Sequence, residues 1–153
     1  MHQYQAKILW ERGEQAFSDN RYSRAHAWEF DGGLVVPASS SPLSVPVPMS
    51  EEKNVDPEEA LVAALASCHM LFYLFFVAKR GYVVDRYRDL AVGIMDKNAQ
   101  GKQAITCIHL RPQESYSGDK QPDLQEREEL HHMAHEHCYI ANSINAEVII
   151  EIE

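Results

Sequence analysis

Apolar and polar residues alternate along several stretches of the chain, as in strands that cover a core with one face. These stretches are residues 4–10, 22–30, 82–95, 103–111 and 147–153. Two other stretches predict helices. The first begins at Asp56 and Pro57, a suitable N-cap and first helical residue, and should end near residues 79–81, where two cations precede a glycine. The second follows Asp123 and runs to about residue 139.

The segments between these elements carry turn residues. Residues 36–54 form a connection with prolines at positions 37, 42, 46 and 48, too many for a central strand. Residues 116–121 are expected to form a loop. The order strands, helix, strands, helix, strand predicts an α+β fold. Because no linker or internal repeat divides the sequence, we expect one domain over residues 1–153.

The chain has 153 residues, which suits one domain with a sizeable core. Its net charge of −9 argues against nucleic acid or an anionic membrane as partner. Three cysteines without disulfide-framework spacing, and no signal peptide, predict a cytoplasmic protein. The apolar run over residues 60–78 approaches the ~20 residues of a membrane span. Ser67, Cys68 and His69 interrupt it, so we expect a buried core helix rather than a membrane partner.

Two of the cysteines lie in the predicted helices. Cys68 follows a nearly all-apolar run, and Cys138 ends the more polar second helix. A free cysteine on an apolar helix is usually inert packing, but two thiols at one site allow a sulfenic acid to be resolved as a disulfide. Cys107 lies in an ordinary strand pattern and is interpreted as packing.

The first of these cysteines lies in a recognisable motif. Residues 57–68, which read Pro-Glu-Glu-Ala-Leu-Val-Ala-Ala-Leu-Ala-Ser-Cys, resemble the signature of the OsmC/Ohr family of osmotically inducible and organic-hydroperoxide-resistance proteins. Cys138, followed by Asn142 and Ser143, matches the second half of that signature. The resemblance extends from the region of Tyr4 to the C-terminal strand.

The resemblance implies a fold and a function. The expected fold is two antiparallel sheets around a central buried helix, in an intertwined homodimer with sites at the subunit interface. The expected enzyme is a thiol peroxidase without a cofactor, in which Cys68 attacks an organic hydroperoxide and Cys138 resolves the product. An external dithiol then restores both thiols. The family also uses an arginine and a glutamate.

Arg24 is the best candidate for that arginine, since it shares the face of its predicted strand with Tyr22 and Trp28. Arg21, near the same turn, is the rival. Glu58 is the candidate glutamate and would orient the arginine. It lies ten residues before Cys68, about 15 Å along one helix. If Glu58 serves a Cys68 site, that site most simply belongs to the partner subunit of a dimer.

Other side chains leave further readings open. Phe72, Phe75 and Phe76 follow Cys68 closely and line either a substrate entrance or plain core. His131, His135 and Cys138 stand at i, i+4 and i+7 and could bind zinc in a metal-dependent enzyme. His69 beside Cys68 suggests a hydrolytic pair, but adjacent helical residues diverge by about 100°, so we interpret it as a satisfied core or pocket histidine. A non-catalytic OsmC-like stress or binding protein is the remaining alternative.

Overall fold

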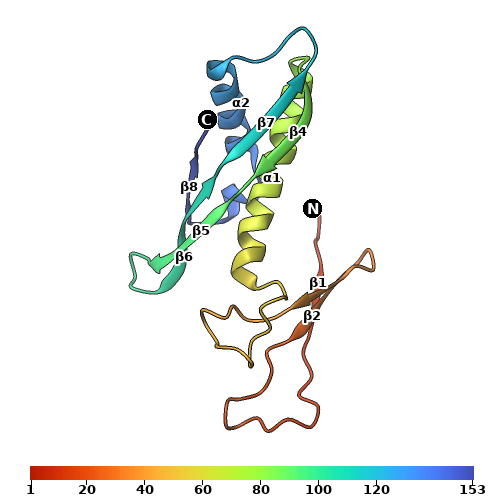
Figure 1. Cartoon of the computed structure of the whole chain (residues 1–153), viewed down its shortest axis with the longest axis vertical. Helices are drawn as coiled ribbons and strands as arrows, with labels where there is room; N and C mark the ends of the chain where they lie inside the picture. The colour runs from red at the N-terminus through yellow and green to blue at the C-terminus, as the bar shows by residue number, and fades with distance from the viewer. The chain divides into compact units, whose positions relative to one another are not determined.

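A computed structural model describes residues 1–153, which form two α-helices, a short 3-10 helix and eight strands (Figure 1). The chain divides into two compact units, Met1–Ala60 and Leu61–Glu153. Helix α1, Pro57–Lys79, begins at the end of the first unit and continues through the start of the second.

The first unit contains a three-stranded antiparallel sheet. Its strands are β1 (Ala6–Leu9), β2 (His26–Phe30) and β3 (Val35–Ala38), in the order β1-β2-β3. Two expectations are corrected here. Strand β2 begins only at His26, so residues 22–25 lie before it. Strand β3 lies partly within the proline-rich connection, where its Pro37 is tolerated because β3 is an edge strand.

Helix α1 starts and ends where its sequence predicts. Asp56 and Glu59 form reciprocal contacts, with the Glu59 backbone N–H donating to Asp56 Oδ1 at 2.8 Å and the Asp56 N–H to Glu59 Oε2 at 3.3 Å. These bonds satisfy two donors of the open first turn. The helix ends at Lys79, and Gly81 follows with a φ of 82°, a conformation that glycine adopts without strain.

The second unit contains two small sheets. Strands β4 (Val83–Asp89) and β7 (Pro112–Ser117) form one antiparallel pair. Strands β5 (Val92–Lys97) and β6 (Gln103–Leu110) pair antiparallel in the other, where β8 (Glu147–Ile150) joins β6 in parallel. The continuous strand expected over residues 82–95 is thus divided between two sheets, and part of the expected loop after residue 115 belongs to β7.

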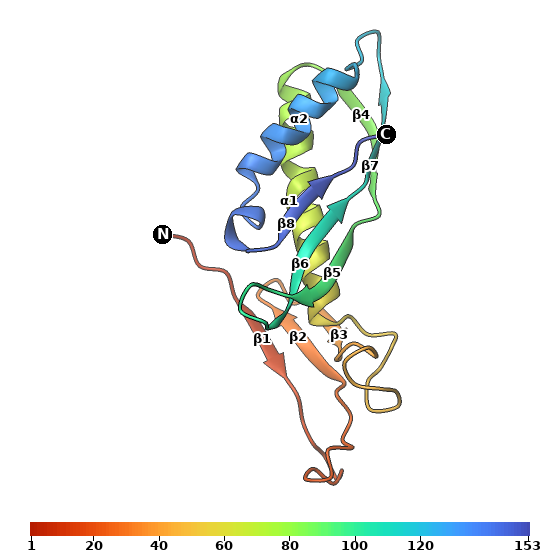
Figure 2. The same ribbon diagram turned by 90° about the vertical axis from the view of Figure 1, so that its left-hand side faces the viewer.

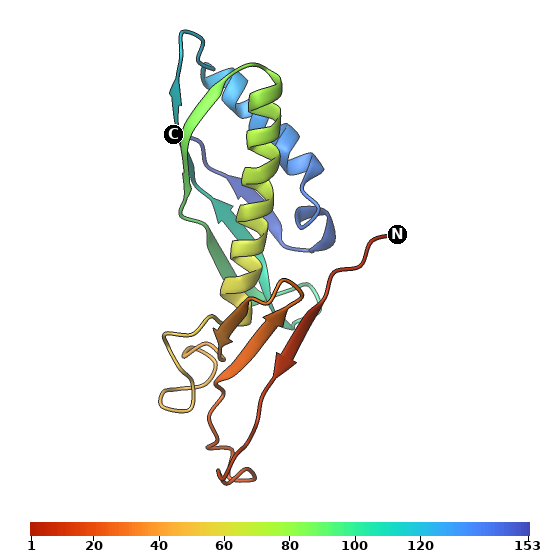
Figure 3. The same cartoon turned by 90° about the vertical axis from the view of Figure 1, so that its right-hand side faces the viewer.

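Helix α2 spans Leu124–His137 on the same face of these sheets as the portion of α1 within the second unit (Figures 2 and 3). Its N-terminus carries a capping box between Asp123 and Glu126, and Cys138 is its C-cap residue. A short 3-10 helix, η1 (Ala141–Ser143), follows and leads into β8. The predicted start and approximate end of this helix are confirmed.

Two apolar clusters form the core of the second unit. The first contains Tyr73, Phe76, Val77, Tyr82, Leu130 and Ala134. The second contains Leu65, Ile108, Leu110 and Cys138. The fold class is α+β, as predicted. The strands differ from the expected two antiparallel sheets, because they form three small sheets and one pairing is parallel. Helix α1 has the length and apolar composition of a membrane span, a property that core helices share, and it contributes residues to both clusters.

Candidate active site

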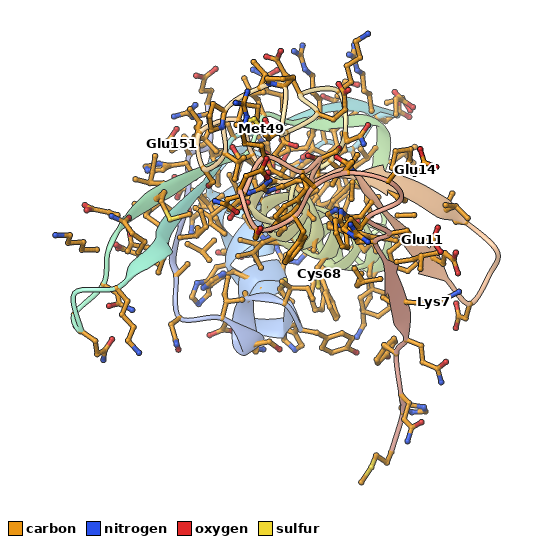
Figure 4. All side chains as sticks on the ribbon, turned by 90° about the horizontal axis from the view of Figure 1, so that it is seen from below. Lys7, Glu11, Glu14, Met49, Cys68 and Glu151 are labelled. Carbon is orange, nitrogen blue, oxygen red and sulfur yellow. The ribbon has the colours of Figure 1, made fainter.

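Cys68 and Cys138 come together from α1 and α2. Cys68 is half-buried and packs against the second cluster, of which Cys138 is a fully buried member. Figure 4 looks along α1 and labels Cys68. Both thiols are free. The structure therefore places a partly accessible thiol beside an inaccessible one, although the two cysteines are 70 positions apart in the sequence.

The surroundings of Cys138 keep it protonated at neutral pH. Burial raises the pKa of its thiol to about 11, the backbone N–H of Ala141 opposes that shift, and the neighbouring Cys68 thiol adds to it. The Ala141 N–H donates to Cys138 Sγ at 3.4 Å. The turn that presents this N–H is held by Asn142, whose side chain donates to Glu136 O at 3.1 Å, and by Ser143, whose hydroxyl donates to Tyr139 O at 2.7 Å. The Asn-Ser pair of the motif thus shapes the turn beside Cys138.

Arg24 is held by groups of the first unit. Its guanidinium donates to Tyr22 O through Nη1, and through Nη2 to Asn20 O at 3.1 Å and Asn20 Oδ1 at 2.9 Å. It also lies 3.7 Å from the centre of the Tyr22 ring, a cation–π contact. A cavity of about 460 Å³ within the same unit is lined by Arg24 together with Ile8, Trp10, Phe17, Tyr22, His26, Ser39, Ser40 and Pro57. Arg21 is exposed and does not line it.

Glu58 is half-buried in the first turn of α1. The capping contacts at this end of the helix are made by Asp56 and Glu59. Glu58 is therefore not the residue that closes the first turn, and its carboxylate is available for another partner.

The three phenylalanines of α1 have different surroundings. Phe76 belongs to the first cluster, which favours the expectation of plain core for this residue. Phe72 packs on the edge of that cluster and against the ring of Tyr139, with centroids 5.0 Å apart. Phe75 is 58% exposed. Phe72 and Phe75 are thus more accessible than Phe76.

The three residues considered as alternative zinc ligands do not converge. No group of three or more His, Cys, Asp and Glu side chains in residues 1–153 has the arrangement of a metal site. His131 bonds through both ring nitrogens, to His69 and to Glu114, while Cys138 packs in the second cluster. The helical spacing that suggested a metal site therefore reflects a different use of His131.

That use is a buried chain of polar side chains. His69 Nε2 lies 2.9 Å from His131 Nδ1, and His131 Nε2 donates to Glu114 Oε1 on β7. Arg127 of α2 donates to Glu114 Oε2 at 2.6 Å. His69 and His131 are each 1% exposed, and the Glu114 side chain is fully buried. The interpretation of His69 as a core histidine with a partner is confirmed.

Charge and burial set the protonation of this chain. Burial lowers the pKa of His69 to about 3, with further lowering by His131 and His135 against an opposing effect of Glu114. Burial by itself would raise the pKa of Glu114, but hydrogen bonds and charges from His131 and Arg127 outweigh it, so the net shift is downward. His69 is consequently neutral and Glu114 ionised at neutral pH.

Sequence reasoning did not find Glu114, Arg127 or the pairing of the two histidines. One signal was present. Pro112, Glu114 and Tyr116 recur at every second position, with solvent-facing Gln113 and Ser115 between them. This alternation is that of a strand with one buried face, and a carboxylate on such a face requires a partner.

Comparisons with known proteins agree with this architecture. A family model described as OsmC-like protein matches residues 50–153. An OsmC-like protein of unknown function from Vibrio cholerae has a solved structure with 55% identity and a TM-score of 0.99, covering 100% of both chains. None of the curated proteins compared with the chain is a significant match.

More distant structures share the fold. An organic hydroperoxide resistance protein from Elizabethkingia anophelis is 14% identical with a TM-score of 0.74, over 100% of this chain and 96% of its own. The organic hydroperoxide resistance protein OhrB of Bacillus subtilis is 19% identical with a TM-score of 0.69, over 98% of both chains. Since the family model covers more than half of the sequence and the 55% identical structure covers all of it, this chain belongs to the OsmC-like family.

Proposed function

We propose that the protein is a thiol peroxidase that reduces organic hydroperoxides to alcohols, working in a reducing cytoplasm. The observation that carries this proposal is the meeting of a half-buried Cys68 with a buried Cys138 whose thiol pKa is raised to about 11. A peroxide can approach the first thiol, whereas the second is suited to react only with a partner already beside it. Relatives described as organic hydroperoxide resistance proteins share the fold.

The reaction would proceed in two oxidative steps. The Cys68 thiolate attacks the distal peroxide oxygen, a sulfur–oxygen bond forms, the O–O bond breaks, and the alkoxide takes a proton to leave as an alcohol. Cys138 then attacks the sulfur of the Cys68 sulfenic acid. A disulfide forms, and hydroxide leaves with the Cys138 proton as water. An external dithiol supplies two electrons and two protons to restore both thiols.

Arg24 is the residue we propose for stabilising the Cys68 thiolate and the developing negative charge. Its guanidinium is oriented by Asn20 and Tyr22 and lines a largely apolar cavity, whereas Arg21 is exposed. Glu58 would orient the same guanidinium. We propose Phe72 and Phe75 as contacts for the organic part of the substrate.

A second copy of the chain is proposed to complete this site. Residues 64, 67, 71, 75 and 78 form an exposed stripe along α1, and Leu71 is 60% exposed. A stripe of this length and apolar character needs a cover. Glu58 lies about 15 Å along the helix from its own Cys68 and can serve the Cys68 of a partner instead. Both observations favour a homodimer with shared sites.

Single-turnover chemistry tests the peroxidase proposal. We expect Cys68→Ser to abolish peroxide reduction, because no attacking thiol remains. Cys138→Ser should consume one equivalent and stop as a sulfenic acid, detectable by dimedone labelling and mass spectrometry. Cys107→Ser is the matched control, since Cys107 lies in β6. Full turnover by the Cys68→Ser protein would refute the proposal.

Mixed dimers test the shared site. A Cys68→Ser subunit paired with a Glu58→Ala subunit should assemble one site with both defects and one with neither. Activity should then recover to about half that of the wild type per mixed dimer, as two-fold symmetry requires. A fully active monomer in sedimentation experiments would exclude this arrangement.

One observation favours a second candidate function, a non-catalytic OsmC-like binding protein. The first unit holds a cavity of about 460 Å³ lined largely by aromatic and aliphatic side chains around Arg24. A cavity of this kind is suited to an apolar ligand with an anionic end. Turnover of several hydroperoxides with a lipoyl dithiol or thioredoxin separates the two candidates, because a binding protein would consume none.

A further inference from the structure

We propose that the buried chain His69–His131–Glu114 fixes the register of α1 against α2 and thereby holds Cys68 against Cys138. His69 and His131 would be positioning residues for formation of the Cys68–Cys138 disulfide. The part of this inference that concerns turnover rests on the proposed peroxidase function.

The two histidines of this buried chain come from the same two helices as the thiols. His69 directly follows Cys68 on α1 and belongs to the buried stripe that includes Leu65 and Tyr73. His131 lies on α2 seven residues before Cys138, about 10 Å along the helix. The 2.9 Å contact between the two imidazoles therefore connects both cysteine-bearing helices, directly after Cys68 on one and two helical turns before Cys138 on the other.

Directional contacts are needed here because apolar contacts are not directional. The first cluster joins Tyr73 and Phe76 of α1 to Leu130 and Ala134 of α2, and burial alone tolerates small sliding or rotation of one helix on the other. Disulfide formation does not tolerate it, since the two Cα atoms must come within roughly 4.4–6.8 Å. A displacement of one residue along α1 is about 1.5 Å and turns the side chain by about 100°.

The ionised Glu114 carboxylate fixes the direction of the hydrogen bonds that it receives. An ionised carboxylate only accepts, so Glu114 receives the His131 Nε2–H. The second contact of His131 joins its Nδ1 to His69 Nε2 at 2.9 Å. Arg127 holds the other oxygen of Glu114 at 2.6 Å. The His131 ring is therefore anchored on β7 through Glu114; it lies nearly coplanar with the His69 ring and stacks on the ring of Tyr73, with centroids 3.9 Å apart.

Substitutions of His69 can separate an effect on thiol positioning from an effect on overall stability. His69→Leu removes the hydrogen-bonding group toward His131 and fills the space with an apolar side chain. His69→Gln keeps a polar group at the ε position that can donate or accept and should restore the contact. His109→Leu is the control, because His109 also makes a side-chain hydrogen bond, to Glu151, but lies on strand β6 and not on either helix.

The first measurement follows the Cys68 sulfenic acid after one equivalent of hydroperoxide. We expect His69→Leu to lengthen its lifetime about tenfold, a typical effect of a misplaced reacting group, while the initial attack on peroxide changes less than about twofold. His69→Gln and His109→Leu should resemble the wild type. Equal slowing of attack and resolution, or an unchanged lifetime in folded His69→Leu, would overturn the proposal.

The second measurement does not use peroxide. The equilibrium between the Cys68–Cys138 dithiol and disulfide is titrated in glutathione buffers, and His69→Leu should lower the disulfide formation constant about tenfold, or about 30 mV. This result is expected even if the wild type reduces no peroxide, so failure of the peroxidase proposal remains distinguishable. If His69→Leu does not fold, His131→Asn, which loses the reach to Glu114 and the stacking on Tyr73, should shift both readouts in the same direction. No shift in that folded variant overturns the proposal.

Discussion

Two clusters in the second unit use the same three residue types in opposite surroundings. Glu114 accepts from His131 and Arg127 where its side chain is fully buried. Glu151 accepts from His109 and Arg111, both at 2.7 Å, with its side chain 42% exposed. We call these the buried and the exposed Glu–His–Arg clusters. Their bonding is alike, and their access to water differs.

Because their surroundings differ, the two clusters contribute differently to stability. In the exposed cluster, water and salt compete with each contact, so the pairing contributes little to stability. In the buried cluster, loss of one partner leaves a charge or a polar atom without solvent, which is costly. Only the buried cluster also connects to α1, through His69. Burial therefore decides which of two chemically similar clusters can constrain the helices.

The largest expected effect comes from breaking the buried cluster at its carboxylate. Glu114→Gln leaves Arg127 with no buried counter-charge and should reduce the free energy of unfolding by about 3 kcal/mol. Urea denaturation followed by circular dichroism measures this change. Glu151→Gln is the control and should leave the urea midpoint close to that of the wild type. Similar losses of unfolding free energy in both variants would contradict a larger role for the buried cluster.

A smaller effect is expected from acid. The pKa of His69 is lowered to about 3 in the folded protein, against an ordinary value of 6.5, mainly by burial and also by His131 and His135. Below pH 6.5 the unfolded chain binds a proton that the folded chain does not. Stability should therefore be complete above that pH and decline by at most roughly 1.4 kcal/mol per pH unit below it, so the loss down to pH 4.5 stays under about 3 kcal/mol.

Urea denaturation between neutral pH and pH 4.5 measures this slope. His69→Gln should flatten it, because the titrating imidazole is gone. His109→Gln should leave it near that of the wild type, since the residue lies in the exposed cluster. The same slope in His69→Gln as in the wild type would mean that His69 is not the group responsible.

The smallest expected effect concerns salt. At about 1 M salt the screening length is roughly 3 Å, so the contacts of Glu151 should be largely screened while those of Glu114 persist. The difference in urea midpoint between Glu151→Gln and the wild type should then vanish at high salt. The corresponding difference for Glu114→Gln should remain. Loss of both differences would indicate that the buried cluster is hydrated.

Local signals in the sequence predicted most helices and strands well. The N-caps Asp56 and Asp123 act through neighbouring residues, and the structure confirms that both helices begin after them. Strand β3 was missed because edge position, which makes Pro37 acceptable, is a property of the whole sheet. The parallel pairing of β8 with β6 likewise depends on residues far apart in the chain.

In the candidate site, too, local sequence predicted some features, and contacts between distant residues decided the others. The motifs around Cys68 and Cys138 identified the family and singled out the two thiols, since motif spacing is local. Helical spacing left zinc binding by His131 open as an alternative, because periodicity reports which residues share a face and not what that face contacts. His69 and Glu114, the groups that it does meet, come from α1 and β7.

The sequence by itself determined the α+β class, the family and the two helices that carry the thiols. These follow from alternation, capping residues and short motifs, which act over a few residues. Only the tertiary structure decided that Cys138 is inaccessible beside a half-buried Cys68, and that Glu114 rather than Glu151 is buried with its histidine and arginine. Burial and side-chain contact depend on how distant segments pack, and that packing determines which of several similar polar groups loses its water.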